Sequence, residues 1–209
     1  MAVLKSGANG NFSGKAGSVV GYVLNGQGII RGMPRRRKKK PTAKEQANRD
    51  KFAMLQFWLQ PLLHYLRIGF KDYAPTFQGF VAAKSYNNKY ALQQREEGCF
   101  FVNPALALIS HGALPLPEAL QMEEKEGGLE VSWAKGIEGR PSDKVMLLAY
   151  APELGVTEGD TTIGTRGAGR AQLSILPRHI PLEWHIYIAF VAYDQSMRSN
   201  SQYLGSITI

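Results

Sequence analysis

Short apolar segments fill the C-terminal half of the chain, and they restrict its fold more than any other feature. Glycine, proline and acidic residues separate these segments, and apolar and polar residues alternate within some of them. Short strands separated by turns are typical of an antiparallel β-sandwich. The expected strands are 119–123, 129–133, 144–151, 161–163, 171–176, 185–193 and 203–209. We therefore expect a sandwich domain over residues 113–209, after a linker-like stretch rich in glycine and proline.

The clearest local signal in the N-terminal half is Asn25-Gly26, which lies between two β-rich runs, 18–24 and 27–31. Asn and Gly tolerate the positive φ angles of a type I′ turn, so this pattern predicts a β-hairpin. A lone two-stranded hairpin is only marginally stable in water, so we expect it to pack on helices or on another subunit. The expected interaction residues of the hairpin are Val19, Val20, Tyr22, Ile29 and Ile30.

Helices are expected between the hairpin and the sandwich. Thr42 and Glu45 match a capping box at a helix start, and Pro61 predicts a break after the apolar part of this helix. A further helix is expected over residues 76–97. The fold class predicted is therefore α+β, with an N-terminal domain over residues 1–112 that holds the hairpin and a helical module.

Positive charge is concentrated between Arg31 and Lys51, a segment that we call the basic strap. It contains ten Lys or Arg residues and two acidic residues, so its net charge equals the +8 of the whole chain. Pro34 and Pro41 bracket its densest part, which favours an extended and exposed backbone. The cationic residues of the strap are Arg31, Arg35, Arg36, Arg37, Lys38, Lys39, Lys40, Lys44, Arg49 and Lys51.

Three interpretations of the basic strap stay open. It can bind the phosphates of a nucleic acid, which requires only accessible cations. The strap contains no aromatic residue on which bases could stack, so such binding would not read the base sequence. It can instead bind an acidic protein, or it can be a solvated linker. Residues 1–100 carry a net charge of +12 and residues 101–209 carry −4, which also suits electrostatic pairing between the halves or between neighbouring copies.

No pattern in the sequence indicates a reaction. The single cysteine, Cys99, excludes an internal disulfide and a zinc site made of cysteines. The four histidines match no metal-ligand spacing, and the stretch around Gly14-Lys15 departs from the phosphate-binding loop. The arginine-containing stretch 164–170 is more simply a strand connection than an anion site. We expect no catalytic residue, metal ion, cofactor or small-molecule substrate.

The sequence also predicts a protein without a membrane segment. Its first residues lack the apolar region of a signal peptide, and the most apolar stretch, 52–70, contains Gln56, Pro61 and Arg67. We therefore expect a cytoplasmic or virion-associated protein with no membrane partner.

Three motifs in the C-terminal half carry a resemblance. They are Leu129-x-Val131-Ser132-Trp133, Tyr187-x-Ala189-Phe190-Val191-Ala192-Tyr193-Asp194 and Ser199-x-Ser201-x-Tyr203. These motifs are similar to the B, F and G strands of a fibronectin type III domain. The resemblance implies a scaffold for interactions and no particular activity.

A second resemblance covers the whole chain. The residues that carry it are Gly14-Lys15-x-Gly17-x-Val19-Val20-Gly21-Tyr22, Pro41-Thr42-x-Lys44-x-Gln46 and Phe77-x3-Val81-x3-Ser85-Tyr86-Asn87. The chain resembles a Bacteroidota family known as a domain of unknown function, and its layout is similar to some phage-associated proteins. Neither resemblance supplies catalytic residues.

The function expected from these observations is structural. We expect a non-enzymatic structural or assembly protein that acts through protein–protein contacts or self-association, in a virion or another multi-copy particle. The alternative is a protein that binds nucleic acid without sequence specificity through the basic strap.

Overall fold

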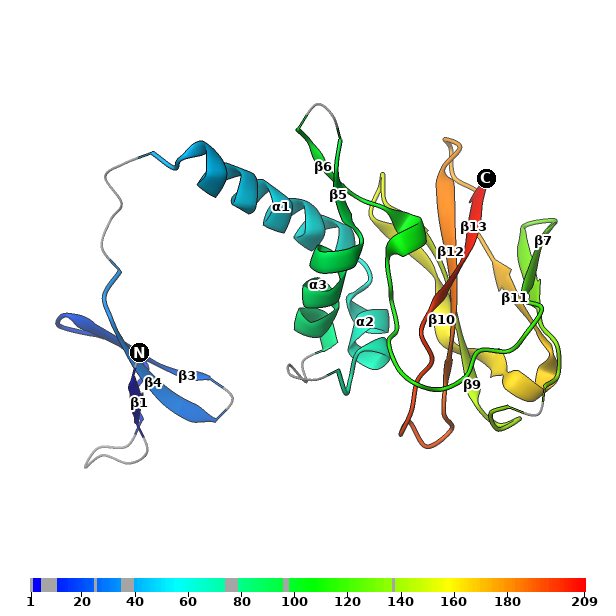
Figure 1. Ribbon diagram of the computed structural model, residues 1–209, viewed down its shortest axis with the longest axis horizontal. Coiled ribbons are helices and arrows are strands. Elements are labelled where there is room, and N and C mark those ends of the chain that lie inside the picture. Colours follow the sequence, from blue (N-terminus) through cyan, green and yellow to red (C-terminus); the bar gives the residue numbers. More distant parts are fainter. Residues whose placement is uncertain are drawn as a thin grey trace. The chain divides into compact units, whose positions relative to one another are not determined.

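The computed structural model describes residues 2–4, 11–24, 26–34, 40–73, 79–95, 98–136 and 138–209. These residues form two compact units, one within residues 1–42 and the other within residues 43–209. The α+β fold class expected from the sequence is confirmed. The described part contains an N-terminal antiparallel sheet, then helices, then antiparallel sheets (Figure 1).

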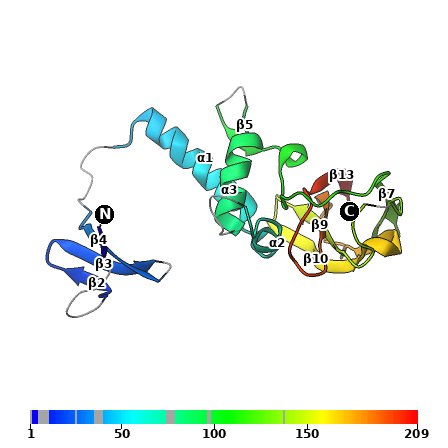
Figure 2. The same cartoon turned by 60° about the horizontal axis from the view of Figure 1, so that its bottom comes forward.

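The first unit is an antiparallel sheet with the strand order β1-β4-β3-β2. Figure 2 labels β2, β3 and β4 of this sheet. Its strands are β1 (Ala2–Leu4), β2 (Gly14–Ala16), β3 (Val19–Leu24) and β4 (Gln27–Gly32). β3 and β4 form the expected hairpin, in which Gly26 adopts a positive φ of 78° that glycine tolerates; Asn25 lies outside the described residues. β1 and β2 pair with the two outer edges of this hairpin, so it belongs to a four-stranded sheet and is not the lone two-stranded hairpin that was expected.

The C-terminal part of the second unit is a sandwich of two antiparallel sheets. The described strands have the order β11-β8-β7 in one sheet and β10-β9-β12-β13 in the other. Their bounds are β7 (Gln121–Lys125), β8 (Gly128–Ser132), β9 (Lys144–Ala151), β10 (Val156–Thr165), β11 (Arg170–Ser174), β12 (Glu183–Val191) and β13 (Gln202–Thr208). The expected antiparallel sandwich is therefore confirmed, and the motifs expected as B, F and G strands lie on or beside β8, β12 and β13.

β10 is longer than the strand expected over 161–163. It pairs with β9 on both sides of an irregularity between Asp160 and Gly164. Gly159 lies within it at a φ of 145°, where a side chain would collide with the backbone of Leu147 on β9. Glycine and acidic residues ordinarily mark turns, so this part of the strand was not recognisable from the sequence.

The described helices of the second unit precede the sandwich. They are α1 (Ala43–Leu59), α2 (Leu63–Gly69) and α3 (Gly79–Tyr90). α1 starts directly after Thr42, and the expected break at Pro61 separates α1 from α2. The helix expected over 76–97 ends earlier than expected, at Tyr90. The chain leaves the helix after Tyr90 because β5 (Leu92–Gln94) pairs with β6 (Phe100–Val102) in an antiparallel hairpin.

The central strands of the larger sheet are buried on both faces. On β9, Leu147 and Ala149 pack into the interior of the sandwich, whereas Met146, Leu148 and Tyr150 belong to a second hydrophobic cluster that includes the helices. The same alternation holds on β12. A strand covered on both faces reads as a continuous apolar run. The helices therefore supply the second covering layer of this sheet (Figure 1).

Hydrogen bonds attach the helices to the sheet at several points. The buried Tyr150 hydroxyl donates to the carbonyl oxygen of Trp58 on α1 at 2.8 Å. The Arg198 guanidinium, in the turn between β12 and β13, donates through Nε to the carbonyl oxygen of Ile68 on α2 at 2.7 Å. Buried polar groups that find such partners favour one fixed arrangement of the packed layers.

The shared core explains where the chain divides. The sequence placed a domain boundary between residues 112 and 113, whereas the compact units meet between Thr42 and Ala43. The helices α1, α2 and α3 pack on β9 and β12 and complete their covering, so they belong to the same unit as the sandwich.

Candidate functional site

The five expected interaction residues of the hairpin lie on opposite faces of the first sheet. Tyr22 lies opposite Ile29 and Val20 opposite Arg31, so these side chains share one face. Val19 and Ile30 belong to the other face, because successive residues of a strand alternate. Ile29 is buried at 6% exposure, and the other four residues are half-buried.

One face of the first sheet is covered by its own chain. A side chain at Gly21 would come within 2.6 Å of the Phe12 ring, and one at Gly28 would collide with Asn11. The segment at residues 11–12 therefore lies across the face that carries Val19 and Ile30. The two glycines allow this close approach.

The opposite face of the sheet, which we call the Tyr22 face, remains partly exposed. Its described side chains on β2, β3 and β4 combine apolar groups with two cations, and the Arg31 guanidinium lies 5.5 Å from the centre of the Tyr22 ring. They are Lys15, Val20, Tyr22, Leu24, Gln27, Ile29 and Arg31. Among the side chains described in the first unit, Ile29 is the one hydrophobic side chain that is buried.

Only part of the basic strap can be placed. Arg35, Arg36, Arg37, Lys38 and Lys39 lie outside the described residues. Arg31, Lys40, Lys44 and Arg49 are exposed, and none of them forms an ion pair with a described acidic residue. Lys51 differs from these residues, because its ammonium lies 4.8 Å from the centre of the Phe100 ring, at a groove that the sequence did not predict.

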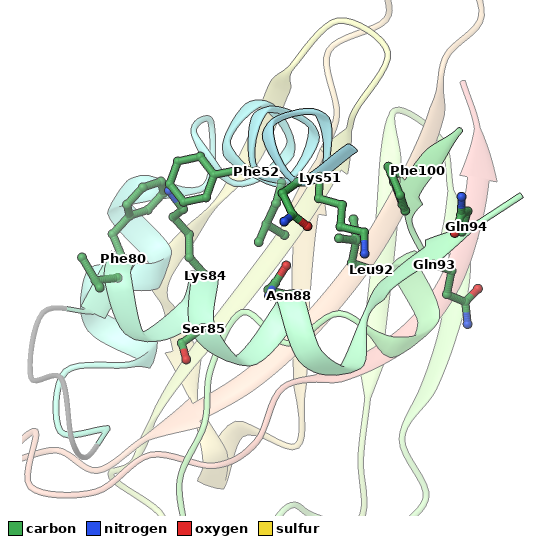
Figure 3. Close-up of a pocket in the computed structure, with 13 residues that line it drawn as sticks. Lys51, Phe52, Phe80, Lys84, Ser85, Asn88, Leu92, Gln93, Gln94 and Phe100 are labelled. Atoms are coloured by element: carbon green, nitrogen blue, oxygen red, sulfur yellow. The ribbon is translucent and has the colours of Figure 1, made fainter. Parts of the chain in front are cut away.

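This groove, which we call the α1–α3 groove, lies between α1, α3 and the β5–β6 hairpin and has a volume of about 760 Å³ (Figure 3). Its apolar lining is Phe52, Leu55, Phe80, Val81, Leu92 and Phe100. Its uncharged polar lining is Asn48, Ser85, Asn88, Gln93 and Gln94. The two charged side chains of the lining are Lys51 and Lys84, and no described lining residue is acidic.

Lys84 is held at one end of the groove by aromatic rings. Its ammonium lies 3.5 Å from the centre of the Phe52 ring and 5.7 Å from that of Phe80 (Figure 3). It also donates a hydrogen bond to Oε1 of Gln56 at 2.7 Å. Burial lowers the pKa of the Lys84 ammonium below its ordinary value, since desolvation disfavours the charged form.

The sequence contained one signal for this groove. Residues 52–59 are apolar on most helix faces, which suggested burial in a core. Leu55 and Leu59 are indeed buried, but Phe52 is 61% exposed. The partners of Phe52 and Lys51 come from α3 and from β6, so their convergence depends on tertiary packing that spacing along the chain does not reveal.

A buried charged group of the second unit, Arg166, serves the fold. The Arg166 guanidinium is buried, with its Nε 3.4 Å from Oδ2 of Asp143, and it donates to the carbonyl oxygens of Pro115 and Glu138 at 2.6 and 3.2 Å. It is therefore a structural anchor of the 164–170 stretch. No group of three or more His, Cys, Asp or Glu residues that could hold a metal ion occurs in the described part of the chain. Likewise, none of its helices is both long and apolar enough to cross a membrane.

Comparisons with known proteins identify a family. Neither the curated proteins nor the solved structures contain a match to this chain. The sequence model of one family matches residues 11–205, and this range includes strands of the first unit and nearly all of the second. The chain therefore belongs to the family of unknown function DUF6266.

Proposed function

We propose that this protein is a non-enzymatic structural or assembly protein that acts through protein–protein contacts, and that its first sheet associates with another copy of the chain. The observation that carries the proposal is the thin core of the first unit. Among its described side chains Ile29 is buried, while Val23, Leu24 and Met33 are each more than two-fifths exposed.

A unit as small as the first one gains little stability from so thin a core. Units of about 40 residues usually need a disulfide, a metal ion or association with another chain to fold stably. The single cysteine of the chain, Cys99, lies outside the first unit, so an internal disulfide is excluded. Burying a large apolar side chain contributes about 1.5–3 kcal/mol. Val20 and Tyr22 are half-buried and Leu24 is 50% exposed, so covering the Tyr22 face would add part of this contribution for each of the three side chains.

The second unit suits the same function. A fibronectin-like sandwich is a scaffold whose function depends on the surfaces it presents rather than on the fold itself. A virion or another multi-copy particle is the setting that we propose, because repeated copies would bring many first-unit sheets together at high local concentration.

Hydrogen exchange of the full-length protein tests this proposal. We expect the amides of β3 and β4 to become more protected as protein concentration rises, because association stabilises the sheet by mass action. Concentration-independent, strong protection in a monomeric protein would show that the first unit needs no other chain, and it would overturn the proposal.

Two adjacent residues provide a matched pair of variants. Leu24 and Val23 are 50% and 53% exposed, and they point to opposite faces of the sheet. Leu24 lies on the Tyr22 face, so Leu24→Asp should abolish the concentration-dependent protection. Val23→Asp places the same charge on the other face and should leave the protection unchanged. Equal effects of the two variants would argue against association through the Tyr22 face.

A second candidate function is binding of nucleic acid by the basic strap. The observation that favours it is the run of exposed cations Lys40, Lys44 and Arg49, which have no ion-pair partner among the described residues. Cations without an ion-pair partner are available to phosphates. In this case added duplex DNA would raise the protein's mass at low salt, and the Leu24→Asp variant would retain that effect.

A further inference from the structure

The α1–α3 groove exposes apolar side chains to solvent. Leu55 is buried at its base, whereas Phe52 and Val81 at its rim are 61% and 44% exposed. Large aromatic side chains are usually covered in a monomeric protein, and exposed apolar surface with a polar rim marks an interaction site. The groove is therefore suited to apolar side chains of another molecule.

The charge of the groove restricts which molecule can enter it. Lys51 and Lys84 approach it from α1 and α3, and its described lining contains no acidic residue. Among the described residues the Lys84 ammonium has one hydrogen-bond acceptor, Gln56, although an ammonium group can donate three hydrogen bonds. An incoming carboxylate would supply an acceptor and an opposite charge in a partly desolvated site. A basic segment would be repelled.

The remaining polar lining fits a polypeptide. Asn48, Asn88, Gln93 and Gln94 place side-chain amides around the groove, and an amide side chain can both donate to a peptide carbonyl and accept from a peptide N–H. The rings of Phe52 and Phe100 each have a lysine ammonium over one face, at 3.5 and 4.8 Å from the ring centre. Those faces are therefore less available for the stacking of nucleic-acid bases.

We propose that the α1–α3 groove binds an acidic segment of a partner protein that carries both carboxylates and large apolar side chains. This proposal rests on the proposed function, since it specifies one of the protein–protein contacts. The carboxylates of the segment pair with Lys51 and Lys84, and its apolar side chains pack on the exposed Phe52 and Val81. The groove lies in the second unit and the Tyr22 face in the first, so separate variants can test the two contacts.

The probe for this site is a fluorescent eight-residue peptide of alternating leucine and glutamate, titrated with full-length protein. We expect saturable binding by fluorescence anisotropy. Binding should weaken strongly when glutamine replaces glutamate in the peptide, and also when serine replaces leucine. Equal binding of the glutamine peptide would overturn the proposed role of charge, and equal binding of the serine peptide would overturn the proposed role of the apolar lining.

Lysine variants locate the binding. Lys84→Gln and Lys51→Gln should each weaken binding about tenfold, in keeping with the loss of a charge-assisted hydrogen bond. Lys89→Gln is the matched control, because Lys89 is exposed on α3 and lies over Tyr90, outside the groove lining. It should change binding by less than about twofold. Should Lys84→Gln unfold the protein, the Lys51→Gln variant still tests the site. Equal effects of Lys51→Gln and Lys89→Gln would overturn the assignment.

Competition distinguishes the class of ligand. Unlabelled leucine–glutamate peptide should displace the probe, whereas a thymidine oligonucleotide or dodecanoate should not. Full displacement by the oligonucleotide or by the fatty acid would overturn the choice of a protein segment. The Leu24→Asp variant should bind the probe normally, so failure of the groove and failure of the first-sheet association would be seen separately.

Discussion

Arg198 provides the sharpest test of the attachment between the helices and the sandwich. Its side chain is buried at 4% exposure in the turn between β12 and β13. Its guanidinium donates to the carbonyl oxygen of Ile68 at 2.7 Å and to that of Gln195 at 2.9 Å, and it forms an ion pair with the carboxylate of Asp72. Arg198→Met keeps most of the apolar stem and removes every donor.

The expected cost follows from these contacts. Leaving a buried acceptor without a donor costs about 1–3 kcal/mol. The carbonyl oxygen of Ile68 would keep a longer bond from the Lys71 N–H at 3.4 Å, and Gln195 is exposed, so water can replace the donor that its carbonyl oxygen loses. The Asp72 side chain is 60% exposed, so its ion pair adds less than about 1 kcal/mol. We expect a loss of about 2 kcal/mol in the free energy of unfolding, which corresponds to a fall of roughly 4–8 °C in Tm for a unit of this size.

Urea denaturation and calorimetry of the full-length protein measure this loss. Asp72→Asn should cost less than about 1 kcal/mol, because only the exposed partner changes. Arg178→Met is the second control, since Arg178 forms an exposed ion pair with Glu158 at 3.0 Å. The reasoning would be refuted by an Arg198→Met variant as stable as Arg178→Met, because the contacts of Arg198 would then contribute nothing to holding α2 on the sheet.

Three further predictions follow from the same contacts. A fragment of residues 43–209 should unfold cooperatively when followed by circular dichroism. A fragment of residues 113–209 should be far less stable, or should aggregate, because it exposes the helix-facing side of β9 and β12. Equal stability of the two fragments would argue against a shared core. Burial lowers the pKa of the His185 imidazole, so the stability that the neutral ring contributes is present above about pH 6.5 and is lost as pH falls through its folded-state pKa. In urea denaturation, the free energy of unfolding should differ less between pH 7.5 and pH 5.5 in His185→Gln than in the unsubstituted protein. An equal difference in the two proteins would exclude this role. If the basic strap binds duplex DNA, log K should fall with log salt at a slope near −5, and Gln in place of the arginines at 35–37 should flatten it by about 3 units; weak binding that is insensitive to the substitution would eliminate the nucleic-acid function.

The sequence revealed those elements whose signals are local. Asn25-Gly26 predicted the hairpin because its turn requires residues that tolerate positive φ. Pro61 predicted the break between α1 and α2 because proline removes a helix hydrogen bond. The apolar strands that became β9 and β12 were also found, because burial leaves a dense apolar run.

The features that escaped sequence analysis depend on contacts between distant segments. An apolar run such as 144–151 shows that a strand is buried but not what covers it, so the helices were assigned to a separate domain. The same limit applies to the groove. Lys51 belongs to the basic strap by its position in the chain, whereas packing places its ammonium against the Phe100 ring. No sequence pattern marks Lys84, because only the packing of α3 on α1 places it beside Phe52.

Sedimentation equilibrium of the full-length protein over a wide concentration range tests the central proposal most directly. Association through the first sheet predicts a mass that rises above that of a single chain as concentration increases, and that returns to a single chain in Leu24→Asp but not in Val23→Asp. A single-chain mass at every concentration, together with fully protected β3 and β4 amides, would contradict the proposal, because the first unit would then be stable without another copy.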